Sequence, residues 1–272
     1  MKKWGWLLSV TLTLSSIMVA CSGQSGGETK KLSDNKLVVG VTAGPHEEIM
    51  EQVKEVAKKE GLDIEIKVFN DYVMPNVALA EKEIDANSFQ TVPYLEQFKK
   101  DRNLDLVDVI HTVTFPMGIY SNKIKDLKAI ANGAKLGIPN DPVNGERALK
   151  LFEKAGVIKL KPGTGHHLTV KDIAENKKNV QFVELEASQI PRQLGELTAA
   201  AINTNFAIEH GFVPTRDAIF MEGKDSPHVN LIAVRTENKN DPVLKKLEKA
   251  YRSAEVKAFI EKEFKGSVIP SW

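Results

Sequence analysis

The sequence contains little of what disulfide or metal chemistry requires. Its 272 residues include one cysteine, Cys21, so the chain cannot form a disulfide within itself. Only two of the six histidines, His166 and His167, are adjacent, and neighbouring loop residues seldom point at one metal ion. They lie in a segment with Gly and Pro, residues 161–167, which is typical of a solvated surface turn. The sequence therefore predicts neither an internal disulfide nor a metal site.

The motifs of nucleotide binding and of hydrolysis are also missing. No G-x-x-x-x-G-K-[ST] loop, G-x-G-x-x-G turn or H-E-x-x-H helix occurs, and no G-x-S-x-G sequence lies between a predicted strand and a predicted helix. Carboxylates are abundant, yet no two of them are singled out as a paired acid and base. The sequence shows no catalytic constellation, so we expect a protein that is not an enzyme and has no cofactor.

The sequence also lacks an excess of basic or acidic residues. The chain has 37 basic and 36 acidic residues, and leaving out Lys2 and Lys3 reduces the basic count to 35, a net charge of −1. Proteins that bind nucleic acid present an excess of basic side chains. We therefore expect no nucleic-acid partner.

The longest apolar run is short and lies at the start of the chain. Residues 6–20 are apolar or hydroxylic, whereas a helix that spans a bilayer needs about 20 apolar residues. With Lys2 and Lys3 before it and a polar segment after it, this run is typical of a secretory signal, residues 1–20. Ala20 followed by Cys21 resembles the bacterial lipoprotein processing signal, with Met18 where leucine is commoner. We expect Cys21 to carry acyl chains such as palmitate that hold the protein at the extracytoplasmic face of the cell membrane; the alternative is an ordinary signal with an incidental cysteine.

After the leader, the pattern predicts a tether and then an α/β protein. Residues 21–36 are rich in Gly, Ser and Lys and predict a flexible linker. Apolar runs of β-branched residues or of period two predict strands at 37–42, 63–69, 84–87, 135–139, 180–185, 199–202 and 229–234. Helical periodicity predicts helices at 46–59, 74–82, 92–101, 146–155, 189–196, 243–251 and 254–264. Such alternation indicates mainly parallel sheets with helices on both faces.

The pattern restarts near residue 135, which favours two lobes. Extended segments at 115–121 and 226–234 would connect them, and ligand sites prefer such interfaces. We expect lobe 1 to comprise residues 37–117 and 228–272, and lobe 2 to comprise residues 118–227. The alternative is a single doubly wound sheet with a long insertion.

One turn has the composition of a carboxylate receptor. A predicted strand runs into a turn rich in Pro, Asn and Asp, after which a helix begins near Asn144. Asn144 and Arg147 are three residues apart and share a face of the first helical turn. A helix N-terminus offers free N–H donors, and a guanidinium can grip two oxygens at once. The alternative is that Asn144 caps the helix while Arg147 is a solvated surface charge.

Four segments together resemble the NlpA-type family, the methionine-binding lipoproteins of ABC importers. They are I-P-N-D-P-x-N-x-x-R-A-L at 138–149, D-A-N-S-F-Q with P-Y-L at 85–90 and 93–95, A-I-N-T-N-F-A at 201–207, and S-P-H-V-N-L-I at 226–232. The resemblance extends in order over residues 37–272. It implies a type II-like periplasmic-binding-protein fold of two lobes with a ligand cleft between them. It also implies a monomer that captures methionine and delivers it to the membrane subunits of an importer.

The resemblance also implies roles for seven residues. Asn144 and Arg147 would hold the ligand carboxylate, and Asn203 and Asn230 would bind the other polar groups of the amino acid. An aromatic side-chain pocket would be formed by Tyr72, Phe89 and Tyr94. Sulfur–aromatic contacts suit a thioether, and asparagine both donates and accepts. For the aromatic residues, ordinary core packing is the alternative.

Position 91 departs from the family pattern. Thr91 stands where family members commonly carry histidine, so the ligand is expected to be methionine or a close relative. The relatives that we consider are D-methionine, a methionyl dipeptide and another apolar amino acid. More distant alternatives are an enzyme on a two-lobed scaffold and a surface protein that binds no small ligand.

Overall fold

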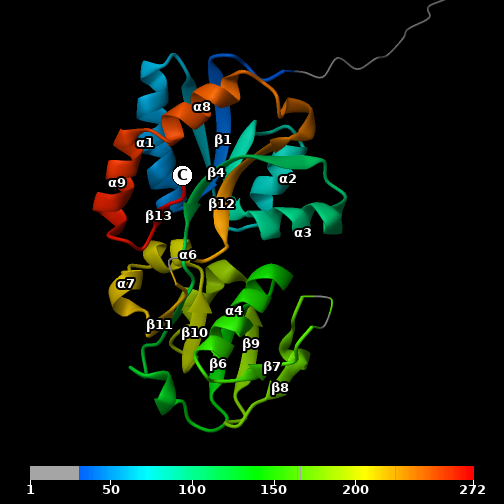
Figure 1. Cartoon of the computed structure of the whole chain (residues 1–272), viewed down its shortest axis with the longest axis vertical. Coiled ribbons are helices and arrows are strands. Elements are labelled where there is room, and N and C mark those ends of the chain that lie inside the picture. Colours follow the sequence, from blue (N-terminus) through cyan, green and yellow to red (C-terminus); the bar gives the residue numbers. More distant parts are fainter. Residues whose placement is uncertain (1–30, 164, 166, 224) are drawn as a thin grey trace, which may run out of the picture.

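The computed structural model describes residues 31–272 except residues 164, 166 and 224 (Figure 1). The predicted signal peptide, Cys21 and most of the predicted tether lie outside this range, as does His166. Among the described residues, no helix is both long enough and apolar enough to cross a membrane.

Lobe 1, the upper half of Figure 1, is built on a six-stranded sheet in the order β13-β4-β12-β3-β1-β2. Its strands are β1 (Lys36–Thr42), β2 (Asp63–Phe69), β3 (Ala86–Thr91), β4 (Leu106–Thr114), β12 (Val229–Arg235) and β13 (Ile269–Pro270). Helices cover both faces: α1 (Pro45–Lys59), α8 (Val243–Tyr251) and α9 (Ala254–Phe264) on one, α2 (Met74–Ala80) and α3 (Val92–Arg102) on the other.

Lobe 2 is built on a five-stranded sheet in the order β11-β5-β10-β6-β9. Its strands are β5 (Gly118–Tyr120), β6 (Lys135–Pro139), β9 (Gln181–Leu185), β10 (Ala199–Ile202) and β11 (Phe220–Met221). A small hairpin pairs β7 (Lys159–Leu160) with β8 (Ile173–Glu175). The helices are α4 (Pro142–Lys154), α5 (Ile190–Gln193), α6 (Thr204–Glu209) and α7 (Pro214–Asp217).

Both sheets contain three parallel strands followed by one antiparallel strand, and in each sheet the antiparallel strand enters from the other lobe. In lobe 1, the parallel strands β2, β1 and β3 are followed by the antiparallel strand β12, which arrives from lobe 2. In lobe 2, the parallel strands β9, β6 and β10 are followed by the antiparallel strand β5, which arrives from lobe 1. Two crossings, residues 115–117 and 222–228, therefore join the lobes, and two sheets replace the alternative of one sheet with an insertion.

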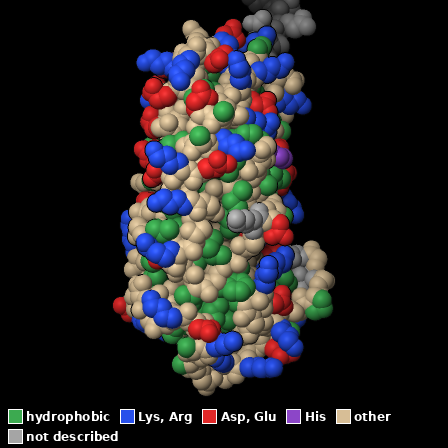
Figure 2. Space-filling view, turned by 60° about the vertical axis from the view of Figure 1, so that its left-hand side comes forward, with side chains coloured by type: hydrophobic (Ala, Val, Ile, Leu, Met, Phe, Trp, Pro, Cys, Tyr) green, Lys and Arg blue, Asp and Glu red, His purple; other side chains and the backbone are tan. Residues whose placement is uncertain are grey.

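Each lobe has its own core, as the apolar periodicity requires. Alternate residues of β1 and one face of α1 are fully buried, including Val39, Val41, Ile49 and Val53. At roughly 25 cal/mol per Å² of buried apolar surface, such residues supply the main favourable contribution to folding. Basic and acidic side chains are interspersed over both lobes on the face shown in Figure 2.

Several predicted elements differ from the structure. The helix predicted at 146–155 is α4, Pro142–Lys154. The strand predicted at 84–87 is β3, Ala86–Thr91, because its polar residues Asn87 and Gln90 hydrogen-bond to buried Asn76. The helix predicted at 189–196 is only α5, Ile190–Gln193, after a 3₁₀ turn. Strand β4 was not predicted at all.

The chain also joins lobe 1 earlier than predicted. Leu32, which we placed in the flexible tether, is 7% exposed and belongs to the core of lobe 1. Its N–H donates to Asp241 Oδ2 at 2.9 Å. The described part of the predicted tether therefore lies against the folded protein.

Candidate functional site

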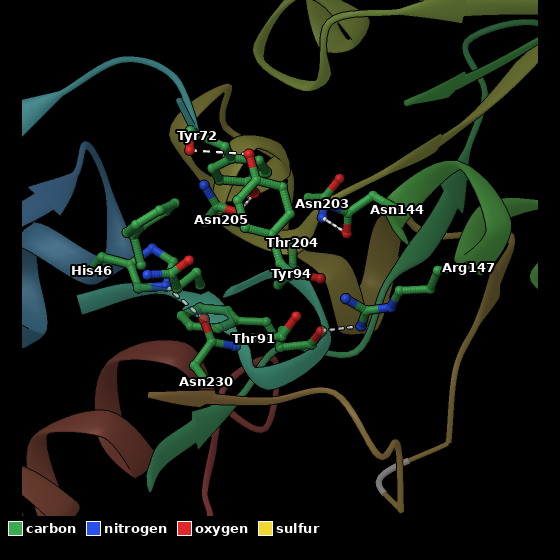
Figure 3. A pocket seen from close by; sticks show the side chains of 13 residues that line it. His46, Tyr72, Thr91, Tyr94, Asn144, Arg147, Asn203, Thr204, Asn205 and Asn230 are labelled. Carbon is green, nitrogen blue, oxygen red and sulfur yellow. Dashed lines mark hydrogen bonds between the residues drawn. The ribbon is translucent and has the colours of Figure 1, made fainter. Parts of the chain in front are cut away.

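A cavity lies between the lobes, where the carboxyl ends of parallel strands of both sheets meet (Figure 3). Thr91 is the last residue of β3, and Asn203 directly follows β10. The cavity contains about 360 Å³ of space between its lining atoms, part of it open to solvent. It is lined by His46, Tyr72, Phe89, Gln90, Thr91, Tyr94, Phe115, Asn144, Arg147, Asn203, Thr204, Asn205 and Asn230.

All seven side chains that the resemblance assigned to a ligand line this one cavity. They come from both lobes and from residues as far apart as 72 and 230. Sequence reasoning missed His46, Gln90, Phe115, Thr204 and Asn205, although Asn205 lies two residues after a predicted ligand residue in the same motif.

Arg147 is buried in α4, with 5% of the residue exposed. Its Nε donates to Glu222 Oε1 at 2.8 Å, and its Nη2 donates to Glu222 Oε2 at 2.5 Å and to the carbonyl of Phe115 at 2.8 Å. Within the described part of the chain, Nη1 has no hydrogen-bond partner. Glu222 thus occupies the edge formed by Nε and Nη2, and the role of Arg147 toward a ligand carboxylate stays a prediction.

A chain of hydrogen bonds orients two asparagines beside Arg147. Asp141 caps α4 by accepting from the backbone N–H of Asn144 at 2.8 Å, and it also accepts from Asn144 Nδ2. Asn144 therefore lies in the first helical turn and is not the cap. Its Oδ1 accepts from Asn203 Nδ2 at 2.9 Å, which leaves Asn203 Oδ1 buried without a partner in the described chain. Burial raises the pKa of Asp141, and the hydrogen bonds from Asn144 oppose that rise.

His46 orients a third asparagine, Asn230, in β12. Burial lowers the pKa of His46 to about 4, so the ring is neutral at pH 7. Its Nε2 lies 3.2 Å from Asn230 Oδ1, an atom that only accepts, so Nε2 carries the proton. Its Nδ1 then accepts from the hydroxyl of Thr42 at 2.8 Å. Because Oδ1 of Asn230 is engaged in this way, its amide nitrogen is the atom left to donate into the cavity.

Tyr72 and Asn205 connect the lobes across the cavity. The hydroxyl of Tyr72 donates to Asn205 Oδ1 at 2.6 Å (Figure 3). Burial raises the pKa of Tyr72 well above its ordinary value, so the phenol remains a donor. Asn205 Nδ2 is buried and has no partner in the described residues. The pair thus presents an unpaired donor to the cavity.

The predicted aromatic pocket is present on the lobe 1 side. Ring centroids lie 5.9 Å apart for Tyr72 and Phe89, 5.8 Å for Tyr72 and Tyr94, and 6.1 Å for Phe89 and Tyr94. The hydroxyl of Tyr94 donates to the carbonyl of Tyr72 at 3.0 Å, which fixes both rings. These rings belong to a buried cluster and also line the cavity, so core packing and ligand contact are compatible.

Thr91 also lines the cavity, with 9% of the residue exposed. It pairs with Asn230 across β3 and β12. The position that departs from the family pattern is therefore part of the cavity wall.

A second contact joins the lobes outside the cavity. His167 is half-buried, and its ring nitrogens lie 2.5 Å from Glu146 Oε2 in lobe 2 and 3.1 Å from Gln97 Oε1 in lobe 1. The sequence predicted a solvated surface turn here, and His167 is partly exposed but also contacts these two partners from distant parts of the sequence. The lobes therefore contact each other through residues outside the cavity lining as well.

The donor set of the cavity does not suit a metal ion. No Asp or Glu is among its lining residues, and the described residues contain no group of three or more His, Cys, Asp or Glu side chains that could hold a metal. What the cavity offers is a cationic nitrogen at Arg147, two amide donors at Asn205 and Asn230, one amide acceptor at Asn203, and an aromatic wall. This arrangement is complementary to a small zwitterion with an apolar side chain.

Comparison with known proteins agrees with this geometry. The NlpA lipoprotein family matches residues 37–272. The chain belongs to this family. It is 46% identical over 241 residues to the D-methionine-binding lipoprotein MetQ of Escherichia coli K12, covering 88% of this chain and 89% of that protein. It is 40% identical to outer membrane lipoprotein 2 of Mannheimia haemolytica, covering 98% of each chain.

Solved structures of related proteins have the same fold. A nutrient-binding protein from Burkholderia cenocepacia, bound to methionine, superposes with a TM-score of 0.85 and 50% identity, covering 87% of this chain and 100% of that one. The methionine-binding protein MetQ superposes with a TM-score of 0.86 and 46% identity, covering 88% and 99%. The chain thus has the two-lobed periplasmic substrate-binding fold predicted from its sequence, and its relatives are binding proteins.

Proposed function

We propose that this protein is a solute-binding lipoprotein that captures methionine between its lobes and delivers it to an ABC importer. The observation that carries the proposal is the set of unpaired polar atoms around one cavity with an aromatic wall. Buried polar atoms are usually hydrogen-bonded, so buried Asn203 Oδ1 and Asn205 Nδ2 indicate a ligand that supplies their partners. The names of the relatives, which include methionine-binding proteins, support the same ligand.

The polarity of these atoms suggests how the amino acid lies. Its carboxylate would accept from Arg147 Nη1 and from the amide nitrogens of Asn205 and Asn230. Its ammonium group would donate to Asn203 Oδ1, whose orientation Asn144 fixes. The thioether would contact the lobe 1 rings, where sulfur–aromatic contacts contribute about 0.3–1.5 kcal/mol each.

Binding would be coupled to closure of the lobes. The crossing at 115–117 is short, so the lobes would rotate about it and about the residues that directly precede β12 as a hinge. The Tyr72–Asn205 hydrogen bond, which spans the lobes, would form only in the closed state. Ligand stabilises that state by its differential affinity for it. No covalent bond is made or broken in this mechanism.

The proposal also includes a lipid anchor, docking on the importer and alternative ligands. Lipidation of Cys21 would hold the protein, as a monomer, at the extracytoplasmic face of the membrane, where the closed form would dock on the importer. Candidate ligands other than L-methionine are D-methionine, a methionyl dipeptide and another apolar amino acid.

Mass spectrometry of ligand released from natively purified protein tests the proposal directly. We expect methionine, and we expect calorimetry of the ligand-free protein to show saturable binding of methionine. Titrations with D-methionine and glycylmethionine rank the alternative ligands. Absence of any retained amino acid, together with no heat of binding for any of these compounds, would contradict the proposed function.

A further inference from the structure

Glu222 is the acidic partner of Arg147, and it lies outside the cavity lining. It is the first residue of the second crossing, and its side chain is 15% exposed. Besides Arg147, its Oε2 accepts from the backbone N–H of Met117 in the first crossing at 2.9 Å and from the hydroxyl of Ser226 at 3.0 Å. One carboxylate therefore joins α4 to both crossings.

The charge of Glu222 cancels that of Arg147 before any ligand arrives. Burial alone would raise the pKa of Glu222, but the hydrogen bonds and the charge of Arg147 outweigh burial and lower it. The carboxyl group is therefore ionised at neutral pH. His228, another titratable side chain near this pair, is neutral because burial and the charge of Arg147 lower its pKa to about 4.

This arrangement weakens the attraction between Arg147 and a ligand carboxylate. A buried, unpaired guanidinium is costly, and a carboxylate ligand would relieve that cost on binding. With Glu222 in place the cost is already relieved, and the ligand gains only the hydrogen bonds of Nη1. The negative charge of Glu222 also repels a second carboxylate on the opposite edge of the same guanidinium.

We propose that Glu222 determines how strongly, and how selectively, the cavity binds a carboxylate. This inference rests on the proposed binding of methionine by Arg147. Glu222 orients the guanidinium so that Nη1 faces the cavity, and its charge lowers the attraction of the guanidinium for a carboxylate. It also makes the charge of the site match a zwitterion rather than an anion.

The test compares two ligands in the variant Glu222→Gln. Glutamine has the shape of glutamate and keeps an acceptor for Arg147, but it removes the negative charge. Calorimetry would be carried out with methionine and with methioninol, which has no carboxylate but retains the ammonium and the thioether. Because the unpaired guanidinium attracts a carboxylate and repels a cation, we expect the preference for methionine over methioninol to rise about tenfold.

Control variants separate charge from structure. Glu146 precedes Arg147 on α4, is similarly buried at 17% side-chain exposure, and pairs with Lys150 and His167 outside the cavity. Glu146→Gln should leave the preference unchanged. Glu222→Asp should raise it by a smaller factor, because the shorter carboxylate cannot reach both Nε and Nη2; this variant provides the test if Glu222→Gln does not fold.

The possible results are distinguishable. If Glu222→Gln weakens both ligands equally, Glu222 has only a structural role and the inference fails. If methionine is weakened more than methioninol, Glu222 acts by orientation alone and the inference about charge fails. If the natural chain binds neither ligand, it is the proposed function that fails.

Discussion

Replacing Arg147 by methionine tests the centre of the proposed site. Methionine fills similar space but removes the cation and the hydrogen bonds to Glu222 and Phe115. Glu222, with a side chain 15% exposed, would be left without its cation. Removing one partner of a buried pair costs about 3–5 kcal/mol of stability. The ligand carboxylate would also lose its charged donor and face an uncompensated carboxylate, so we expect binding to weaken by about 2–5 kcal/mol, or from roughly 30-fold to a few thousand-fold.

The assay must separate weaker binding from loss of folded protein. Isothermal titration with methionine would be combined with urea unfolding of the same samples. Arg235 provides a matched control, because this arginine in lobe 1 is also buried, at 8% exposure, and hydrogen-bonds to Asn238 and to backbone carbonyls far from the cavity. Arg235→Met should lower stability while the folded fraction keeps its affinity for methionine.

A double variant identifies the cause of the loss. In Arg147→Met with Glu222→Gln no buried charge is left unpaired, so stability should largely return while methionine affinity stays low. Recovery of affinity in the double variant would mean that the stranded carboxylate, and not the missing donor, caused the loss. A loss of less than tenfold in folded Arg147→Met would refute the assignment of Arg147 to the ligand.

Three further predictions concern closure, pH and anchoring. Tyr72→Phe removes the donor to Asn205 across the lobes. Because a neutral hydrogen bond contributes about 0.5–1.5 kcal/mol, methionine should bind roughly 2- to 10-fold more weakly. Small-angle scattering should also show less ligand-induced compaction. An unchanged Kd and unchanged compaction would contradict this role. His46 becomes protonated near pH 6.5 in the unfolded chain and at about pH 4 in the native chain, so native stability should fall as the pH decreases through this window. His46→Gln should remove about 2–3 kcal/mol of the difference in unfolding free energy between pH 7.0 and 4.5. An identical pH dependence of urea unfolding in the variant and the natural chain would contradict this prediction. Cys21→Ala should release the protein into the soluble fraction, and membrane retention with the leader still cleaved would argue against lipidation.

The sequence pattern alone predicted the bounds of those strands and helices that have a clear apolar periodicity. The bounds predicted for β2, β6, β10, α8 and α9 coincide with those of the structure. Strand β3 was misplaced because its polar side chains are favourable only in the presence of Asn76, which no local rule reveals. Strand β4 was missed although residues 106–114 are rich in β-branched side chains, so here the signal was in the sequence.

From the sequence, only those residues of the candidate site could be predicted that the family resemblance assigns to a ligand. The resemblance named seven residues that line one cavity, while their contacts with a ligand remain predictions. It did not name His46, Asn205 or Glu222, because their roles depend on partners far along the chain. These partners lie 184 residues away for His46, 133 for Asn205 and 75 for Glu222. Only the folded topology brings such residues together.

The proposed site would bind a zwitterionic ligand although no acidic side chain lines the cavity. Glu222 acts through Arg147, and Asp141 acts through Asn144 on the amide of Asn203. Glu222 therefore fixes the direction of a donor through one intervening side chain, and Asp141 fixes the direction of an acceptor through two. Burying an unpaired charge is expensive, and the pairing of Arg147 with Glu222 avoids that cost before a ligand arrives. In the proposed site a zwitterion would therefore meet oriented dipoles and one cation that is already neutralised.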